Sequence, residues 1–565
     1  MSFAAATYRW ILPSFDHEQA EALSQELGIP PIIVHLLAQR NLRSASAIKD
    51  FLNPSLAQLT NPFDLTGMHE AVNRILVARK RQESVLIFGD YDVDGISASV
   101  ILERGLRRFG LNRIHCDMPD RFAEGYGLSP EHVRAAKDQD VNLIITVDNG
   151  ISAHEAAQCA SDLGLDLIVT DHHSLEKELP AAVAVINPKQ DDPTHPAHML
   201  AGAGVALKVA TALNGTPHDL DIAALGTVSD IVPLLAENRV IVALGIRHMI
   251  KHQRIGLKSL AKAGHFNIAE VSSQKISFQL GPRLNAAGRL ETGHKAWQLL
   301  MTEREDEADA LAEELDETNE KRRGIEQRIF EEAEEILAAF WNDEQRSIVL
   351  AEKNWHQGVI GIVASRMQAR YFLPVIICCL GDDGLFHGSA RGNVGFNMVE
   401  ALEACSEHLI TFGGHVAAAG LTLAPEAIDA FRDAFEKEAR RQLGSKKTEP
   451  ILNVHACIAL SQIDRDFMRQ IHKLEPFGQS NPEPLFCTVG VSVVPQSMHL
   501  LNEQHLKFMV RQGDTVFTAL AFGMAERFYT EEFPEKLDII FSPFVNTFRG
   551  ETSIQLTIKD MCAAR

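Results

Sequence analysis

Residues 85–95 read VLIFGDYDVDG, a run of four apolar residues followed at once by three aspartates at alternating positions. An uninterrupted apolar run indicates a strand that is covered on both faces, as in a parallel sheet. Two further, nearly continuous apolar runs, at 143–147 and 167–170, are followed by Asp148 and by Asp171-His172-His173. We therefore expect an α/β domain with a parallel sheet, whose reactive side chains gather at the carboxyl ends of the strands, where ligands bind in open α/β sheets.

Asp90, Asp92 and Asp94 concentrate negative charge that a cation must neutralise. The same spacing opens a calcium-binding EF-hand loop, but Ile101 stands where that loop carries its bidentate glutamate, and a strand rather than a helix precedes it. A solvated acidic turn is the other alternative. The carboxylates and histidines further along the chain favour a site for a hard divalent metal.

Asp148, the histidine pair at 172–173 and Asp230 extend this acidic cluster. Taken singly, Asp148 is typical of a turn, the histidine pair of a structural role, and Asp230 of a helix terminus. Together, several carboxylates and a neutral imidazole suit Mn²⁺ or Fe²⁺ and, less specifically, Mg²⁺. The carboxylates outnumber the needs of one such ion. This excess predicts two ions about 3.5–4 Å apart, an arrangement that catalyses in-line phosphoryl displacement.

These motifs resemble those of the DHH phosphoesterase superfamily, and residues from about 80 to 565 are similar to its bacterial single-strand-specific 5′→3′ DNA exonucleases. The resemblance implies metal ligation by Asp92, Asp94, Asp148, His172 and Asp230. It also implies that His173 faces the substrate phosphate or the nucleophile, with Asp90 as a lesser catalytic partner. Some relatives carry histidine at the position of Phe88. This chain lacks that ligand, so the second ion is expected to bind more weakly or to arrive with the substrate.

Phosphoryl transfer also needs cations or amides on the phosphate oxygens. Glycine lets the backbone approach a phosphate closely, and arginine binds it with a two-pronged fork. Both residue types gather at 281–289, at 388–392 and in an expected loop at 413–415. The candidate substrate-binding residues are Arg283, Asn285, Arg289, Ser389, Arg391, Gly413, Gly414 and His415. For any one arginine, a surface salt bridge is the alternative. The resemblance implies phosphate contacts for Arg289, Ser389, Arg391 and His415, with Arg289 in the catalytic set.

The patterns along the chain predict five parts. These are a helical accessory segment (1–75), the catalytic domain (76–300), a long connecting helix (301–345), a second α/β domain (346–445) and a small β-barrel (446–565). The helix is expected from a charged, glycine-poor run with apolar residues at helical spacing. The second α/β domain resembles the DHHA1-type domain that accompanies DHH domains, and the barrel resembles an OB-fold.

OB-folds track single strands with basic groups and stacking aromatic rings. The candidates for this role are Lys507, Phe508, Arg511, Phe548 and Arg549. Core aromatic rings and solvated charges are an equally good interpretation of these residues.

Composition bounds the class of protein. The chain has 565 residues, 45% hydrophobic and 23% charged, which is usual for a folded protein of several domains. A net charge of −21 argues weakly against a generic nucleic-acid binder, but the acidic run at 303–346 supplies about half of it. The sequence contains no run of about 18 apolar residues, so it predicts no membrane-spanning helix. The start lacks the pattern of a secretory signal, and the eight cysteines lack metal-ligand spacing, so we expect a cytoplasmic protein. We also expect the protein to be a monomer.

The resemblance implies a metal-dependent exonuclease that degrades single-stranded DNA to 5′-mononucleotides. Its implied context is DNA repair and recombination, including mismatch repair, beside a helicase and a single-strand-binding protein. Two alternatives stay open: a phosphoesterase for short oligonucleotides or cyclic dinucleotides, and a non-catalytic strand-binding scaffold. Chains of the first kind are shorter than this one, and scaffolds of the second kind have lost the ligands that this chain retains.

Overall fold

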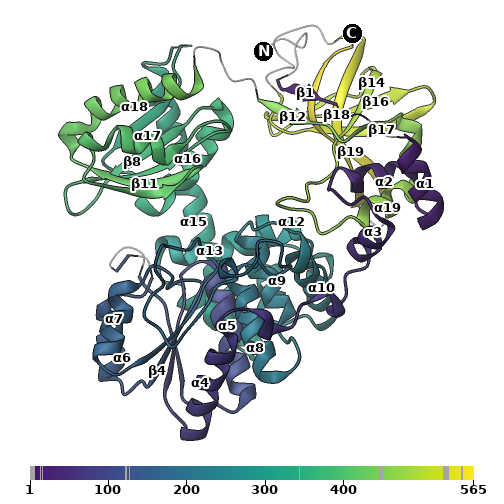
Figure 1. Ribbon diagram of the computed structural model, residues 1–565. Coiled ribbons are helices and arrows are strands. Elements are labelled where there is room, and N and C mark those ends of the chain that lie inside the picture. Colours follow the sequence, from purple (N-terminus) through teal and green to yellow (C-terminus); the bar gives the residue numbers. More distant parts are fainter. Residues whose placement is uncertain are drawn as a thin grey trace.

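The computed structural model describes residues 7–12, 14, 17–120, 124–125, 127–342, 344–444, 450–525, 534–548 and 551–564. Figure 1 shows three lobes. The parallel-sheet domain lies at the bottom, the second α/β domain at upper left, and the barrel at upper right with the N-terminal helices beside it.

The first domain is built on a five-stranded sheet in the order β3-β2-β4-β5-β6, and every pairing in it is parallel. Its strands are β2 (Val85–Phe88), β3 (Ile114–Asp117), β4 (Leu143–Val147), β5 (Asp166–Thr170) and β6 (Ala184–Ile186). The predicted α/β class and parallel sheet are confirmed. The apolar runs predicted β2, β4 and β5, whereas β3 and β6 were not expected because they are short and lie at the sheet edges.

Helices cover both faces of this sheet, which explains the uninterrupted apolar runs. Val85 and Ile87 pack in one core with α4 (Met68–Arg81), α5 (Val93–Phe109) and α8 (Gly202–Asn214). Leu86 and Phe88 face the opposite side, with α6 (Pro130–Asp138) and α7 (His154–Asp162). Successive side chains of a strand point to opposite faces, so every residue of β2 must be apolar.

Further helices enlarge the first core and lead out of the domain. They are α9 (Leu220–Ser229), α10 (Ala236–His252), α11 (Ile255–Ala263), α13 (Gly281–Leu290) and α14 (His294–Met301). Helix α15 (Glu305–Ala338) follows, with 34 residues, so it is about 51 Å long at 1.5 Å per residue. It contacts α11, α13 and α14 of the first domain and α16 (Gln357–Tyr371) of the second.

The second α/β domain has a five-stranded sheet in the order β10-β11-β9-β8-β7. Its strands are β7 (Ile348–Glu352), β8 (Val375–Leu380), β9 (Phe386–Arg391), β10 (Thr411–His415) and β11 (Ala418–Leu423). The loop expected at 413–415 is wrong, because these residues form the end of β10. Gly414 has φ +151, and a Cβ there would lie 2.4 Å from the Ala418 carbonyl oxygen, so close strand pairing rather than a loop requires glycine.

The C-terminal domain is a closed barrel. Its sheet runs β13-β14-β18-β19-β17-β16-β15, and an additional pairing of β14 with β16 closes the ring. The strands are β13 (Ala456–Cys457), β14 (Phe486–Val493), β15 (His499–Leu501), β16 (His505–Gln512), β17 (Thr515–Ala521), β18 (Lys536–Phe548) and β19 (Glu551–Ala563). The predicted OB-like barrel is confirmed. Helix α19 (Arg465–His472) precedes β14.

The N-terminal segment packs on the barrel. Its elements are β1 (Arg9–Ile11), α1 (His17–Leu27), α2 (Pro31–Ala38) and α3 (Ala45–Leu52). Ile33 and Phe51 share a core with Phe486 of the barrel. The expectation of a purely helical segment is wrong at Arg9–Ile11, which pairs in parallel with β12 (Ile451–Asn453). Across the described ranges, no helix combines the length and the apolar character needed to cross a membrane.

Candidate metal centre

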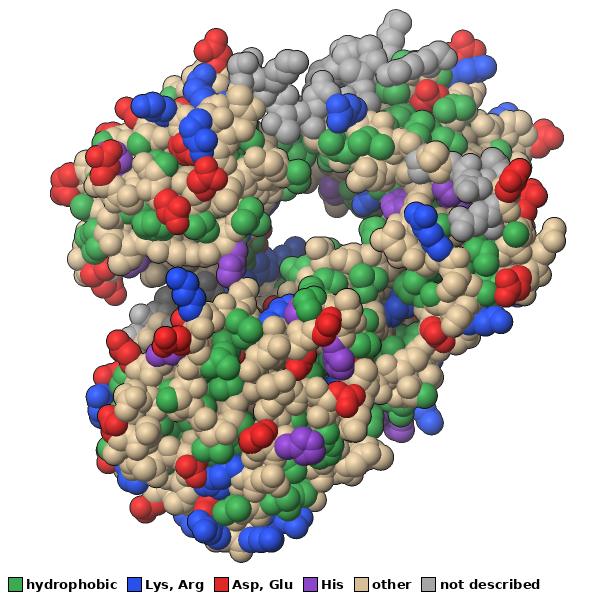
Figure 2. Space-filling model, viewed as in Figure 1, with side chains coloured by type: hydrophobic (Ala, Val, Ile, Leu, Met, Phe, Trp, Pro, Cys, Tyr) green, Lys and Arg blue, Asp and Glu red, His purple; other side chains and the backbone are tan. Residues whose placement is uncertain are grey.

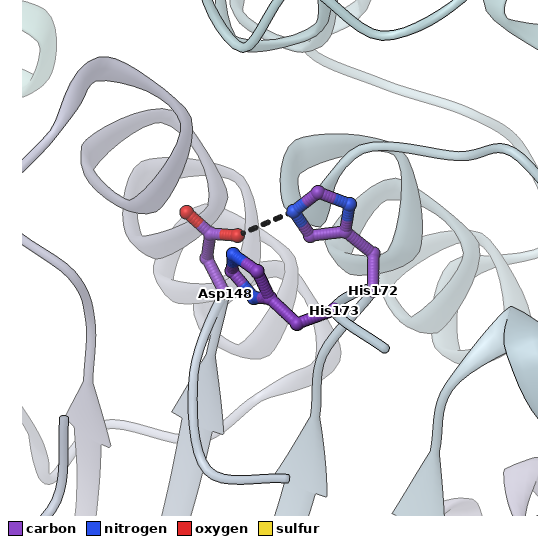
Figure 3. A group of neighbouring side chains, drawn as sticks. All are labelled: Asp148, His172 and His173. Atoms are coloured by element: carbon purple, nitrogen blue, oxygen red, sulfur yellow. Dashed lines mark ion pairs between the residues drawn. The ribbon is translucent and has the colours of Figure 1, made fainter. Parts of the chain in front are cut away.

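The predicted ligands come from adjacent strand ends. Asp90 follows β2, Asp148 follows β4 and His172 follows β5, and these three strands are neighbours in the sheet. Asp230 joins them from the carboxyl end of α9. Figure 3 shows the side chains of Asp148, His172 and His173 converging from two of these strand ends.

His172 lies at the centre of the cluster. Its Nε2 atom is 3.0 Å from Oδ1 of Asp148, 3.6 Å from Oδ2 of Asp230 and 3.9 Å from Oδ2 of Asp94. The structure brings possible ligand atoms within 4.8 Å of one another in three overlapping groups: Asp94-His172-Asp230, Asp148-His172-His173 and Asp90-Asp92-Asp148. All five residues proposed as metal ligands, with Asp90 and His173, therefore occupy one site. Overlapping groups of oxygen and imidazole donors suit one or two divalent ions.

Two helix N-termini orient the carboxylates of the first motif. Asp92 is the N-cap of α5, and its Oδ1 accepts hydrogen bonds from the backbone N–H groups of Asp94 (2.9 Å) and Gly95 (3.0 Å). Asp94 accepts from the N–H groups of Gly202 (2.6 Å) and Ala203 (3.0 Å) at the start of α8. A helix N-terminus stabilises negative charge. These bonds fix the direction of both carboxylates before any ion binds.

Gly202 and Asn149 were not predicted to matter here. A Cβ at Gly202 would lie 2.6 Å from Oδ1 of Asp148, so only glycine leaves room for that carboxylate. The Asn149 side chain donates to the carbonyl oxygens of Phe88 (3.1 Å) and Val147 (2.9 Å), which ties the ends of β2 and β4 together. The sequence signal for Asn149 is its place directly after the predicted ligand Asp148, whereas Gly202 is distant in the sequence from every predicted ligand and carried no signal.

The electrostatics of the cluster fit a bound cation. Burial and the nearby aspartates raise the pKa of Asp148 well above its usual value. Burial and the charges of other aspartates likewise raise the pKa of Asp94 to about 7 and that of Asp230 to about 9. Burial lowers the pKa of His172 to about 4, so its imidazole is neutral, the form that binds metal. Divalent ions would let these carboxylates ionise together.

Asp171 orients His173. Its Oδ1 lies 2.7 Å from Nδ1 of His173, and its Oδ2 accepts from the Ile151 N–H at 3.0 Å. Burial disfavours an imidazolium, but the hydrogen bond and the charge of Asp171 outweigh it and raise the pKa of His173 to about 9. A carboxylate that fixes a histidine in this way is a common partner of metal and phosphate sites. Sequence reasoning gave Asp171 no role of its own.

The candidate phosphate-binding residues of α13 have distinct environments. Arg283 forms an ion pair with Asp316 of α15, with Nε 2.7 Å from Oδ1. Asn285 accepts a hydrogen bond from the Val93 N–H at 3.1 Å, so it supports the loop that carries the aspartates. Arg289 reaches the second domain, where its Nη1 donates to the Gly358 carbonyl at 3.3 Å.

The remaining candidates meet at one end of the second sheet. Arg391 Nη1 lies 3.0 Å from the Ser389 hydroxyl, and Arg391 Nε lies 3.0 Å from the Ser365 hydroxyl on α16. His415 is in register with Ala418, which is in register with Arg391. Arg289 contacts the first turn of α16, and Arg391 contacts Ser365 about two turns further along, so the two arginines lie along the same helix.

A cavity of about 500 Å³ lies beside the metal centre. Its lining includes Ser229 and Ile231 on either side of Asp230, Asn285 and Arg289 of α13, and residues 477–479 of the C-terminal domain. The space-filling view shows a wider opening between the three lobes (Figure 2). An extended polymer such as single-stranded DNA therefore has room to pass between the domains.

In the barrel, the burial of β16 alternates. Leu506, Phe508 and Val510 are fully buried, whereas Lys507 and Arg511 are exposed. Of the two interpretations of Phe508, the structure favours the core aromatic ring, because Phe508 is buried and points into the barrel core rather than toward a bound strand of DNA. The Phe548 side chain and Arg549 lie outside the described residues.

The fold and the site define a DHH-type protein with a metal centre at the carboxyl edge of its parallel sheet. Residues 84–227 match the DHH family N-terminal domain, residues 344–441 the DHHA1 domain, and residues 454–560 the RecJ OB domain. The chain belongs to the RecJ family.

The relatives cover nearly the whole chain. The single-stranded-DNA-specific exonuclease RecJ of Bacillus subtilis is 36% identical over 559 residues, which is 98% of this chain and 71% of the relative. RecJ of Escherichia coli is 33% identical over 94% of this chain and 96% of its own length. A crystal structure of Thermus thermophilus RecJ in complex with Mn²⁺ matches with a TM-score of 0.85 and 28% identity, over 99% of this chain and 80% of that one.

Proposed function

We propose that this chain is a metal-dependent exonuclease specific for single-stranded DNA, which it degrades in the 5′→3′ direction to 5′-mononucleotides. The observation that carries the proposal is the convergence of Asp94, Asp148 and Asp230 on His172. Its curated relatives are named single-stranded-DNA-specific exonucleases, and Thermus RecJ was crystallised with Mn²⁺ and with Mg²⁺. The 5′ polarity and the mononucleotide product rest on the family resemblance.

The proposed metal ligands are Asp92, Asp94, Asp148, His172 and Asp230. When bound, a pair of Mn²⁺ or Mg²⁺ ions supplies a water-derived nucleophile at neutral pH and neutralises charge on the phosphate. His173, held by Asp171, donates a hydrogen bond to a phosphate oxygen. Phe88 replaces a ligand found in some relatives, so the second ion is the weaker one.

The second domain, together with Arg289 of α13, grips the DNA strand. The phosphate oxygens of the DNA are bound by Arg289, Ser389, Arg391 and His415. Gly413 and Gly414 let the backbone of β10 approach the DNA closely. The hydrogen bond of Asn285 to Val93 and the ion pair of Arg283 with Asp316 favour supporting roles for these two residues. Lys507 and Arg511 on the outer face of the barrel hold the strand further along.

The cellular setting follows from the same resemblance. We expect a cytoplasmic monomer that acts in recombination and mismatch repair beside a helicase and a single-strand-binding protein. The division at residues 75, 300, 345 and 445 also stays a prediction.

Hydrolysis of a 3′-labelled single-stranded oligonucleotide of about 40 nucleotides tests the activity. With Mn²⁺ or Mg²⁺ we expect 5′-mononucleotides, no reaction in EDTA and little on a blunt duplex. A biotin–streptavidin block on the 5′ end is expected to stop the reaction, whereas the same block on the 3′ end leaves it unchanged. Faster hydrolysis of linear or cyclic dinucleotides would favour the short-substrate alternative. Strand binding without metal-dependent hydrolysis would favour the scaffold.

A further inference from the structure

The first turn of α10 joins the metal centre to the barrel. This turn begins six residues after Asp230, and it carries three consecutive buried polar residues. Glu237, Asn238 and Arg239 are 0%, 1% and 3% exposed. Buried polar groups need partners, so each of these side chains fixes some other part of the chain.

Two of the three residues secure neighbouring segments of the first domain. Glu237 accepts hydrogen bonds from the N–H and the hydroxyl of Thr60, in the link that follows the N-terminal helices, and forms an ion pair with Lys208 at 2.7 Å. Asn238 donates to the Pro233 carbonyl at 3.1 Å. The segment between Asp230 and α10 is therefore tied to the helix that follows it.

Arg239 reaches into the barrel lobe. It makes four hydrogen bonds, all to backbone carbonyl oxygens. Nε donates to Phe51 at 3.1 Å, Nη1 donates to Leu474 at 3.0 Å, and Nη2 donates to Glu475 at 2.8 Å and Lys473 at 3.5 Å. The guanidinium also lies 3.5 Å from the centre of the Phe51 ring. A planar fork with five donors satisfies this set of acceptors, and a lysine ammonium does not.

The residues that Arg239 holds continue into the wall of the cavity. We call residues 473–483, which connect α19 to β14, the barrel-side segment. The Leu234 N–H donates to the Gln479 carbonyl at 2.8 Å, and the Ser273 hydroxyl donates to the Phe477 carbonyl at 2.6 Å. Within six residues the barrel-side segment passes from Arg239 to the cavity beside Asp230.

We propose that Arg239 is a positioning residue for long substrates. Arg239 holds the barrel-side segment and the end of α3 against the first domain, and this contact fixes the position of the barrel. Single-stranded DNA bound to the barrel then leads into the cavity beside the metal centre. This inference rests on the proposed exonuclease function. A short oligonucleotide occupies the metal centre without the barrel. A long single strand binds the metal centre and the barrel together. Its affinity is higher when the spacing between these two sites is fixed, because the second contact then forms within the same complex.

The test compares kcat/KM for a 5′-phosphorylated trinucleotide with that for a single strand of about 40 nucleotides, in Mn²⁺. For Arg239→Leu we expect the long-to-short ratio to fall about 10-fold, mainly through KM of the long strand, because the second contact is no longer aligned. Hydrolysis of the trinucleotide stays within about twofold of the unaltered protein. Arg239→Lys keeps the charge but lacks the fork, and it is expected to lose much of the ratio as well.

Arg247→Leu is the matched control. Arg247 lies on the same helix, is exposed and donates to the Pro54 carbonyl at 3.4 Å. The ratio should not change in this variant. Gly478→Val is a second probe, should Arg239→Leu fail to fold. A Cβ at Gly478 lies 2.7 Å from Cδ1 of Leu234, so a larger side chain moves the barrel-side segment while Arg239 is retained, and the ratio should again fall.

An unchanged ratio in folded Arg239→Leu and Gly478→Val, or an equal loss on both substrates, would overturn the inference. Equal kcat/KM values for the long and short substrates in the unaltered protein would do the same. Absence of metal-dependent hydrolysis of either substrate by the unaltered protein would instead contradict the proposed function.

Discussion

Nε2 of His172 lies 3.0 Å from Oδ1 of Asp148, although the two residues follow different strands. The parallel pairing of β4 with β5 places both at the same edge of the sheet. Asp148 belongs to two of the three donor groups in the centre, and its neighbours include Asp90 and His173. It is therefore a carboxylate whose loss disturbs both halves of the site.

Asp148→Asn is expected to lower kcat on single-stranded DNA by at least about 100-fold, which is about 2.7 kcal/mol of transition-state stabilisation. An amide is a weaker ligand and leaves the positive charge of the ions less well balanced. The rate of nucleotide release at saturating Mn²⁺ measures this loss, and calorimetric titration with Mn²⁺ measures the weaker binding. Asp138→Asn, on the exposed end of α6, is the control. Equal rates for Asp148→Asn and the control would remove Asp148 from the site.

Removal of the metal is expected to make stability depend on pH. In the metal-free protein, folding raises the pKa of Asp94 to about 7 and that of Asp230 to about 9, and it raises that of Asp148 well above its usual value. Above pH 6.5 the folded state therefore binds more protons than the unfolded state, and stability falls as pH rises through these values. Folding lowers the pKa of His172 from 6.5 to about 4, so proton loss from this residue in the unfolded state opposes the trend near pH 6.5. Folding raises the pKa of His173 to about 9, and this change reinforces the trend.

Thermal unfolding in EDTA at pH 6.5 and pH 8.5 checks this expectation. We expect Tm to be lower at pH 8.5, Mg²⁺ to restore it, and the increase caused by Mg²⁺ to be larger at pH 8.5. Asp230→Asn should flatten the pH dependence, because one titrating carboxyl is removed. A Tm in EDTA that rises between these pH values would refute the electrostatic account of the site.

Phe508→Ala is expected to destabilise the barrel by about 3–5 kcal/mol, the usual cost of emptying a buried phenylalanine site. Phe508 is 0% exposed, whereas the next residue, Met509, is 40% exposed on the opposite face of β16. Met509→Ala should therefore change the free energy of unfolding by less than about 0.5 kcal/mol. Denaturant titration of both variants distinguishes them. Similar stability combined with weakened DNA binding in Phe508→Ala would restore the stacking role that its burial argues against.

Lys507 and Arg511 are expected to contribute through phosphate charge alone. Each contact with a single strand releases counterions, so replacing one residue with glutamine should reduce the slope of log K against log salt by about 0.7. Fluorescence anisotropy of a labelled oligonucleotide in EDTA measures binding without hydrolysis. Glu503→Gln, at an exposed acidic position before β16, serves as the comparison. If the slope of log K against log salt is unchanged in the variants of both Lys507 and Arg511, the DNA binds elsewhere on the barrel.

The sequence predicted the parts of the fold whose signals are local. Strand β2 is an uninterrupted apolar run and β4 and β5 are nearly continuous ones. The long helix α15 has apolar residues at helical spacing over 34 residues. The metal cluster was predictable because parallel strands deliver their carboxyl ends to one edge. Asp230 is the exception, because it lies at the end of α9 rather than at a strand end, so the sheet alone does not place it in the site.

The remaining features depend on strand pairings that the sequence pattern does not reveal. Arg9–Ile11 becomes a strand only because residues 451–453 lie beside it. Gly413 and Gly414 are typical of a loop until their pairing with Gly420 and Ala419 is known. The inward position of Phe508 depends on the register of β16, and a shift of one residue would reverse which side chains face the core.

The N-terminal strand β1 pairs in parallel with β12, which leads into the barrel. Asp560, fully buried near the end of β19, accepts hydrogen bonds from the Tyr8 N–H (3.0 Å) and the Trp10 indole (2.8 Å). During translation, helices α2 and α3 leave the ribosome hundreds of residues before the barrel against which they pack. Domains fold as units while synthesis proceeds, so the parallel-sheet domain is the first lobe to be completed. Helices α2 and α3 are made before it, but the barrel residues that they contact are made last. If translation stops before the barrel is made, Ile33 and Phe51 remain exposed to water. Exposed apolar side chains of this kind bind chaperones or promote aggregation.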